Sequence, residues 1–247
     1  MLSLETLILV FATFMVAGLV KGTVGLGLPL VAVTVLALPL GLREAIAVVL
    51  IPGVVTNFWQ ALAGPYFRSL SRRLWSFMLM CIIGTWIGAN ILSFASQTVL
   101  MTLLGTLIVL YSLFSLSRPQ IKPPGRAEPV LAPLAGGLAG ILYGMTSIFL
   151  IPGILFLQAL GLKKDELVQA LGMVFILLNL SLITAFVEKG FFSIEAAMLS
   201  TFALVPAAMG VYLGQRLRHR ISEQRFRTIF FYVLLVMGLY FVISAQL

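Results

Sequence analysis

Long apolar runs dominate the chain, and they are too continuous to be one face of a helix or strand. In the first part they cover Leu4–Val20, Leu28–Leu40, Ala45–Leu62, Leu74–Phe94 and Val99–Leu116. In the second part they cover Val130–Leu160, Leu167–Val187, Ala196–Leu213 and Ile229–Ala245. A bilayer core about 30 Å thick needs about 20 apolar residues per crossing helix. Because only helices or closed barrels satisfy the backbone there, the pattern predicts an all-α polytopic membrane protein with about 8 hydrophobic elements in 8–10 segments.

Composition agrees with this interpretation. Apolar residues make up 61% of the chain and charged residues 10%, too few charges for a water-soluble surface. The net charge of +8 comes from short basic loops, so the charge rule for membrane loops explains it better than nucleic-acid binding. Cys81 lies alone in an apolar run and His219 in a basic loop, so we expect no disulfide, no metal site and no cofactor. The N-terminus lacks a basic signal region, so Leu4–Val20 is interpreted as a retained membrane segment.

One polar linker, residues 118–129, separates a first membrane repeat (1–117) from a second (130–247). Each half opens with an apolar stretch interrupted by glycine and small polar residues, at Gly18–Pro29 and at Gly136–Ser147. Each interruption is followed by a short Gly-Leu loop and then by a helix that contains one asparagine. The separations of Gly22 from Gly140, Gly41 from Gly161 and Asn57 from Asn179 are 118, 120 and 122 residues. A duplication with small insertions explains this drift.

Loop charges indicate that the two halves are inverted. The loop after the asparagine helix is basic in the first half (Arg68, Arg72, Arg73) and holds only Glu188 and Lys189 in the second. After the next helix the pattern is reversed, with an uncharged turn at 95–97 and a loop with five arginines between residues 216 and 227. Basic loops stay inside, so equivalent loops face opposite sides. We therefore predict two inverted-topology repeats, each an interrupted helix or hairpin followed by three transmembrane helices.

The linker also belongs inside, which makes the stretch Val130–Leu160 begin and end on the same side. This favours a hairpin of two short helices there and in Leu4–Leu40, with both chain termini outside. The alternative is that each interrupted stretch is one long kinked crossing.

Interrupted helices in matching places of two inverted halves are the best sequence indication of a transport site. The exposed N–H groups of a half-helix suit an anion, and glycine allows close approach of the backbone. The alternative is tight helix packing by small residues. The candidate substrate-binding residues are Lys21, Gly22, Thr23, Gly25, Gly27, Pro29, Asn57, Gln60, Tyr143, Thr146, Ser147 and Asn179.

Lys21 is the sharpest candidate, because it is the only basic side chain deep within the first interrupted segment. Charges inside a membrane are costly and usually functional. The alternative is that Lys21 lies at a helix end and extends its ammonium to the headgroups. No acidic residue falls in the middle of a predicted spanning helix, which argues against a cation site. No nucleotide-binding loop, metal cluster or catalytic triad is present, so we expect no enzyme.

The stretch from Gly18 to Val31, followed by Ala45 and by residues 56–60 (Thr-Asn-Phe-Trp-Gln), resembles the TauE/SafE sulfite exporter family. The second half, from Gly140 through the 163–166 loop, is also similar to that family, although Tyr143-Gly144-Met145-Thr146 stands where a richer glycine run is common. The resemblance covers nearly the whole chain. It implies transport of small anions, chiefly sulfite, sulfonates and related organic acids, usually outward across the bacterial inner membrane.

The leading hypothesis is a secondary transporter that exports such an anion, as a multi-pass protein of the cell inner (plasma) membrane. One alternative is a non-transporting membrane subunit or anchor of a partner complex, and another is an anion channel. The predicted partners are the small anionic substrate and the lipid bilayer. Because a chain of 247 residues is short, a homodimer is also among the predicted partners.

Overall fold

The computed structural model describes residues 3–25, 27–62, 64–117, 122–149, 151–218 and 223–245. Within these ranges every regular element is a helix. The helices are α1 (Leu4–Val24), α2 (Leu28–Leu40), α3 (Leu42–Leu62), α4 (Phe67–Phe94), α5 (Gln97–Ser117), η1 (Gly125–Ala127), α6 (Glu128–Thr146), α7 (Gly153–Ala159), α8 (Lys164–Glu188), α9 (Ile194–Phe202), α10 (Leu204–Arg218) and α11 (Glu223–Ser244).

Seven helical stretches in the described residues are long and apolar enough to cross a membrane. They are α1, α3, α4, α5, α6 with η1, α8, and α9 with α10, while α2 and the part Thr228–Ser244 of α11 are shorter apolar stretches. The all-α membrane class predicted from the apolar runs is confirmed. The sequence also predicts that no acidic residue lies in the middle of a spanning helix. In the structure the described acidic residues lie in the first or last turns of their helices.

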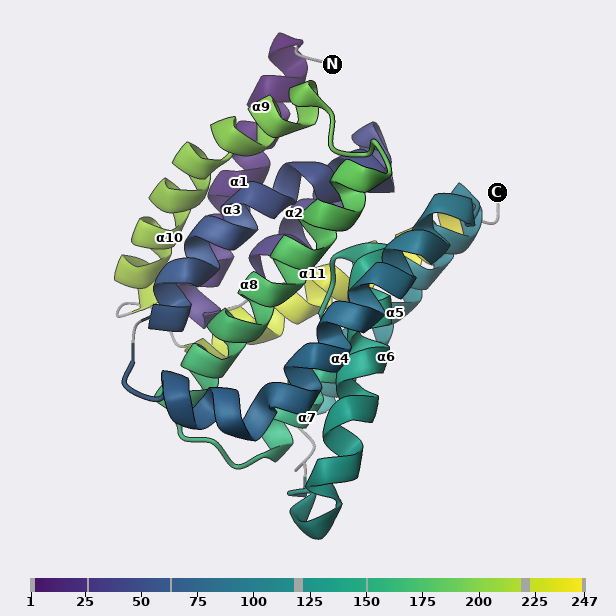
Figure 1. Cartoon of the computed structure of the whole chain (residues 1–247). Helices are drawn as coiled ribbons and strands as arrows, with labels where there is room; N and C mark the ends of the chain where they lie inside the picture. Colours follow the sequence, from purple (N-terminus) through teal and green to yellow (C-terminus); the bar gives the residue numbers. More distant parts are fainter. Residues whose placement is uncertain are drawn as a thin grey trace. The chain divides into compact units, whose positions relative to one another are not determined.

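The chain forms two compact units, and both are assembled from distant parts of the sequence. Unit 1 comprises Met1–Pro52, Ala95–Pro119 and Gly190–Leu247, and unit 2 comprises Gly53–Phe94 and Gln120–Lys189. In unit 1, α1 packs along α10 and against α2, and α5 packs against α11. In unit 2, α4 packs along α6 and against α8, and α7 contacts both α6 and α8 (Figure 1).

Each unit therefore pairs helices from both halves of the sequence. The long pair in unit 1 is α1 from the first half with α10 from the second, and the long pair in unit 2 is α6 from the second half with α4 from the first (Figure 1). Two related halves that exchange equivalent helices would produce this reciprocal pattern. The division into repeats 1–117 and 130–247, and their inversion across the membrane, stay predictions.

Close-packed glycines hold these two helix pairs together. A Cβ on Gly22 would lie 2.9 Å from the Gly214 Cα, and one on Gly144 would lie 2.9 Å from the Gly88 Cα. Such contacts bring backbones close where no hydrophobic force acts between helices. The prediction that the glycine runs interrupt the helices is therefore wrong for Gly18, Gly22, Gly136, Gly140 and Gly144, because all of them lie within continuous helix.

The interruptions are shorter and later than predicted. The prediction of two short helices per stretch is wrong for the first member of each, because α1 has 21 residues and α6 has 19. Each is followed by a shorter helix, α2 of 13 residues or α7 of 7 residues. The predicted basic loop at Arg68–Arg73 is also wrong: these residues form the start of α4, since a helix tolerates charge outside the bilayer core.

Two further expectations have partial outcomes. The run Ala196–Leu213 divides at Ala203 into α9 and α10, close to Pro206, which cannot donate a backbone hydrogen bond. Residues 118–121 of the predicted linker and His219 in the predicted basic loop lie outside the described residues.

Candidate functional site

The first interruption lies between the end of α1 at Val24 and the start of α2 at Leu28. Gly25 caps α1 with φ 84° and Gly27 precedes α2 with φ 105°, both in the left-handed region that favours glycine. Pro29 stands in the first turn of α2, where its fixed φ suits a helix start. The three candidates at this turn thus have structural roles that set its geometry.

The N-terminus of α2 is buried and has no side-chain cap. Leu28 is fully buried and Leu30 is 5% exposed, so the first turn of α2 lies in the protein interior. Uncapped N–H groups at a helix start bear partial positive charge. This end of α2 is electrostatically suited to a negative group.

Lys21 lies in the last turn of α1, one turn before this break, and is 8% exposed. It is the one charged side chain among the buried polar residues of the described chain. A lysine that reaches the headgroups keeps its ammonium exposed, so burial disfavours that alternative for Lys21. Thr23, on the same turn, donates its hydroxyl proton to the carbonyls of Leu19 and Val20 at 2.8 and 2.9 Å.

The second interruption follows α6 and is built differently. Ser147 caps α6 in the left-handed region, with φ 56°, and is the only described non-glycine residue with positive φ. The Thr146 hydroxyl donates to the Leu142 carbonyl at 2.7 Å and accepts the Ile148 N–H at 3.2 Å. Thr146 therefore stabilises the turn and has no proton left for a ligand.

Ser147 combines strain with an unsatisfied polar group. It is fully buried, and although the Tyr143 hydroxyl is close enough to interact with it, Ser147 Oγ has no hydrogen-bond partner of ordinary geometry among the described residues. Burying a hydroxyl without a partner costs about 1–3 kcal/mol. A strained backbone costs about 1 kcal/mol more, and such strain concentrates at functional sites.

Tyr143 and Asn179 form the polar centre of unit 2. The Tyr143 hydroxyl donates to Asn179 Oδ1 at 3.0 Å, and the Asn179 amide donates to the Phe175 carbonyl at 2.7 Å. Asn57 makes the matching bond in α3, to the Gly53 carbonyl at 2.7 Å. A Cβ on Gly53 would lie 2.7 Å from Asn179 Oδ1, so Asn179 packs closely against the glycine whose carbonyl Asn57 bonds.

Aromatic rings enclose this polar centre. Phe149, just after the turn, contacts the rings of Tyr143 and Phe175 with centroids 6.5 and 5.4 Å apart. It also contacts Phe77 of α4 at 6.2 Å. These buried rings exclude water, which strengthens polar interactions inside the cluster.

Gln60 does not belong to this cluster. Its amide donates to the Val168 carbonyl near the start of α8 at 2.9 Å, well before Asn179 in that helix. Beside it lies Gln169, which the sequence interpretation missed. Gln169 is 1% exposed; its amide donates to the Ala61 and Gly64 carbonyls and accepts from the Tyr66 N–H. Gln169 thus caps the end of α3. The sequence feature that could have identified it is a polar residue inside an otherwise apolar run.

The helix ends give a clearer correspondence between the halves than the glycines did. The Gly25 N–H bonds the Lys21 carbonyl at 2.8 Å, and the Ser147 N–H bonds the Tyr143 carbonyl at 2.6 Å. Gly25 and Ser147 are 122 residues apart, as are Lys21 and Tyr143 and the two asparagines. This pairs Gly22 with Gly144, and not with Gly140 as the sequence spacing suggested. The two halves thus place a lysine and a tyrosine at equivalent positions.

Comparison with known proteins now identifies the class. The family model for sulfite exporter TauE/SafE matches residues 10–241. The chain therefore belongs to the TauE/SafE family, and it is a multi-pass membrane transport protein. Searches of the curated proteins and of the solved structures found no match.

Proposed function

We propose that this protein is a secondary transporter that exports a small anion, such as sulfite, a sulfonate or a related organic acid, across the inner (plasma) membrane. The proposal rests on one observation above the others: Lys21 is buried in the last turn of α1, directly before the uncapped N-terminus of α2. Both features favour negative charge. Membership of a family of sulfite exporters supports the same substrate class.

Within unit 2, Ser147 and Asn179 carry neutral hydrogen-bond donors that suit an oxyanion. Ser147 supplies a hydroxyl that no described residue satisfies, and Asn179 keeps one amide proton after its bond to Phe175. Tyr143 holds the Asn179 side chain in place through its hydroxyl. Neutral donors bind an oxyanion without neutralising its charge, so the anion is bound weakly enough to be released.

Of the predicted substrate contacts, we retain Lys21 in unit 1 and, separately, Ser147 and Asn179 in unit 2 as candidate ligands. Gly22 packs against α10, and the Thr23 and Thr146 protons are committed to backbone carbonyls. Gly25, Gly27 and Pro29 shape the first turn. Direct contact by Asn57 and Gln60 stays a prediction.

The sequence limits the energy sources that could drive transport. It has no nucleotide-binding motif, and its acidic residues lie at helix ends. An anion that leaves a cell with a negative interior moves down the membrane potential, which supplies about 2.3 kcal/mol per charge at 100 mV. Potential-driven export is the simplest coupling, and it needs no proton-carrying carboxylate.

Purified protein in liposomes tests the proposal. We expect saturable sulfite efflux that increases under an outward-driving potential, and counterflow in which external unlabelled sulfite accelerates labelled efflux. Flux that does not saturate and shows no counterflow would identify an anion channel. No flux of sulfite, sulfonates or carboxylates under any imposed gradient would favour a non-transporting subunit, which the alternative hypothesis describes.

A further inference from the structure

Helix α4 is longer than a membrane crossing requires. Its 28 residues span about 42 Å at 1.5 Å per residue, against a bilayer core of about 30 Å. Its continuous apolar part begins at Leu74, so we assign the first turns, Phe67–Arg73, to headgroup depth. Trp75 is 63% exposed at this boundary, the depth at which tryptophan is enriched in membrane proteins.

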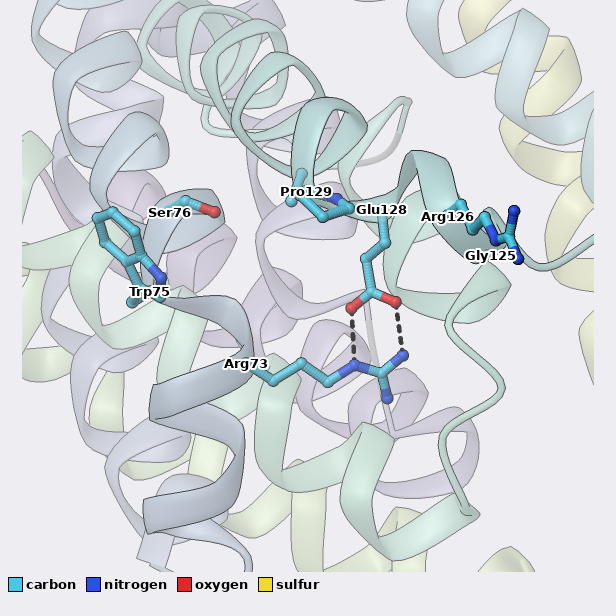
Figure 2. A pocket seen from close by; sticks show the side chains of 8 residues that line it. Arg73, Trp75, Ser76, Gly125, Arg126, Glu128 and Pro129 are labelled. Atoms are coloured by element: carbon cyan, nitrogen blue, oxygen red, sulfur yellow. Dashed lines mark hydrogen bonds and ion pairs between the residues drawn. The ribbon is translucent and has the colours of Figure 1, made fainter.

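A groove lies at this depth within unit 2. Arg73, Trp75 and Ser76 of α4 face the start of α6 across a cavity of about 500 Å³. Figure 2 shows Arg126 extending away from the Arg73–Glu128 pair at the other end of the groove. A second hollow of about 640 Å³ shares Trp75 and adds Phe67, Arg68, Ser71 and Arg72.

The charges of this region do not cancel. Arg73 donates two hydrogen bonds to the Glu128 carboxylate, at 2.7 and 2.8 Å (Figure 2). This pair occupies the one carboxylate of the groove. Arg68, Arg72 and Arg126 form no ion pair with the described residues. Three uncompensated positive charges thus surround two hollows that are also walled by exposed aromatic rings.

We propose that this groove is a binding site for an anionic phospholipid. Arg72 and Arg126 attract the headgroup, and the apolar hollow beside Phe67 and Trp75 takes the upper part of an acyl chain. Basic clusters next to a membrane helix bind anionic headgroups in this way. A small hydrophilic anion would gain nothing from the exposed rings, which is why a lipid fits better than a free anion. None of the residues that line the two hollows is among the proposed transport residues, so the lipid proposal does not depend on them.

Lipid titration of the purified full-length protein in nonionic detergent tests the site. Binding is measured by native mass spectrometry and by the rise of the melting temperature with phosphatidylglycerol, phosphatidylcholine or inorganic phosphate. We expect phosphatidylglycerol alone to bind and stabilise. Each basic residue near an anionic headgroup contributes about fivefold, so the double variant Arg72→Gln with Arg126→Gln should bind about 30-fold more weakly.

Two further variants make the test specific. Arg216→Gln is the matched control, because Arg216 lies over the exposed ring of Tyr212 at 4.4 Å but lines neither hollow; the lipid affinity of this variant should stay within about twofold of wild type. Glu128→Gln frees the Arg73 guanidinium from its ion pair and should strengthen phosphatidylglycerol binding about fivefold. This variant tests the site even if the double variant does not fold. Equal binding of both lipids, no loss in the double variant, or stabilisation by phosphate as strong as by phosphatidylglycerol would overturn the proposal.

Discussion

Tyr143 donates a hydrogen bond to Asn179 across 3.0 Å, and both side chains are completely buried. This bond joins the end of α6 to the middle of α8 within unit 2, next to the strained Ser147. It explains how a chain with few buried polar groups keeps an amide fixed beside an interruption. The bond has consequences for stability that differ from those for transport.

Removal of the hydroxyl in Tyr143→Phe should destabilise the protein. The change leaves Asn179 Oδ1 buried without this donor, and an unsatisfied buried acceptor costs about 1–3 kcal/mol. A lower melting temperature in detergent checks this result. Tyr240→Phe is the control, because Tyr240 is 56% exposed and its hydroxyl should make no difference. Equal effects of the two variants would show that the bond contributes nothing.

Two glycines of α6, three residues apart, should respond oppositely to alanine. A Cβ on Gly140 would lie 2.4 Å from the Cys81 carbonyl oxygen, so Gly140→Ala must separate α6 from α4. Overpacking of this kind costs about 1–3 kcal/mol. A Cβ on Gly137 would meet only Met80 Cε at 3.5 Å, and Gly137→Ala should be neutral or stabilise by about 0.5–1 kcal/mol through helix propensity. Melting temperatures of the two variants decide the matter, and similar losses would refute the packing described for α4 and α6.

Ser147→Gly should increase stability and decrease transport. Glycine adopts the left-handed conformation without strain, as Gly25 does at the equivalent cap, and removes the unsatisfied hydroxyl. The combined gain is about 2–4 kcal/mol. Ser147→Ala separates the two effects, because it removes the hydroxyl but keeps the strain. If sulfite flux in liposomes is unchanged in a stabilised Ser147→Gly protein, the serine is not a ligand.

The sequence was informative wherever the physics is local. Apolar length defined α2 at Leu28–Leu40 and came within a few residues for α3, α5 and α8, because the bilayer imposes its thickness on each segment. The equivalence of Asn57 and Asn179 also followed from spacing, and both make the same bond to the carbonyl four residues earlier.

What the sequence could not provide depends on partners distant in the chain. Glycine runs looked like interruptions because helix propensity says that glycine breaks a helix in water. In the structure Gly18 and Gly144 are surrounded by the backbone of another helix, and no local pattern names that helix. The unsatisfied hydroxyl of Ser147 and the three bonds of Gln169 were likewise invisible, because they are defined by what surrounds them.

Sulfite flux through liposomes with Lys21→Met, beside Lys21→Arg and Lys122→Met, tests the central claim most directly. Lys122 is an exposed lysine of the linker, so Lys122→Met removes the same charge without touching the buried position. The account predicts that Lys21→Met still folds yet loses at least tenfold in sulfite flux, because a tenfold loss corresponds to about 1.4 kcal/mol and a buried charge that attracts the anion contributes at least that much. Lys21→Arg should keep part of the flux and Lys122→Met all of it. Wild-type flux in a folded Lys21→Met protein would contradict the claim that this buried lysine attracts the transported anion.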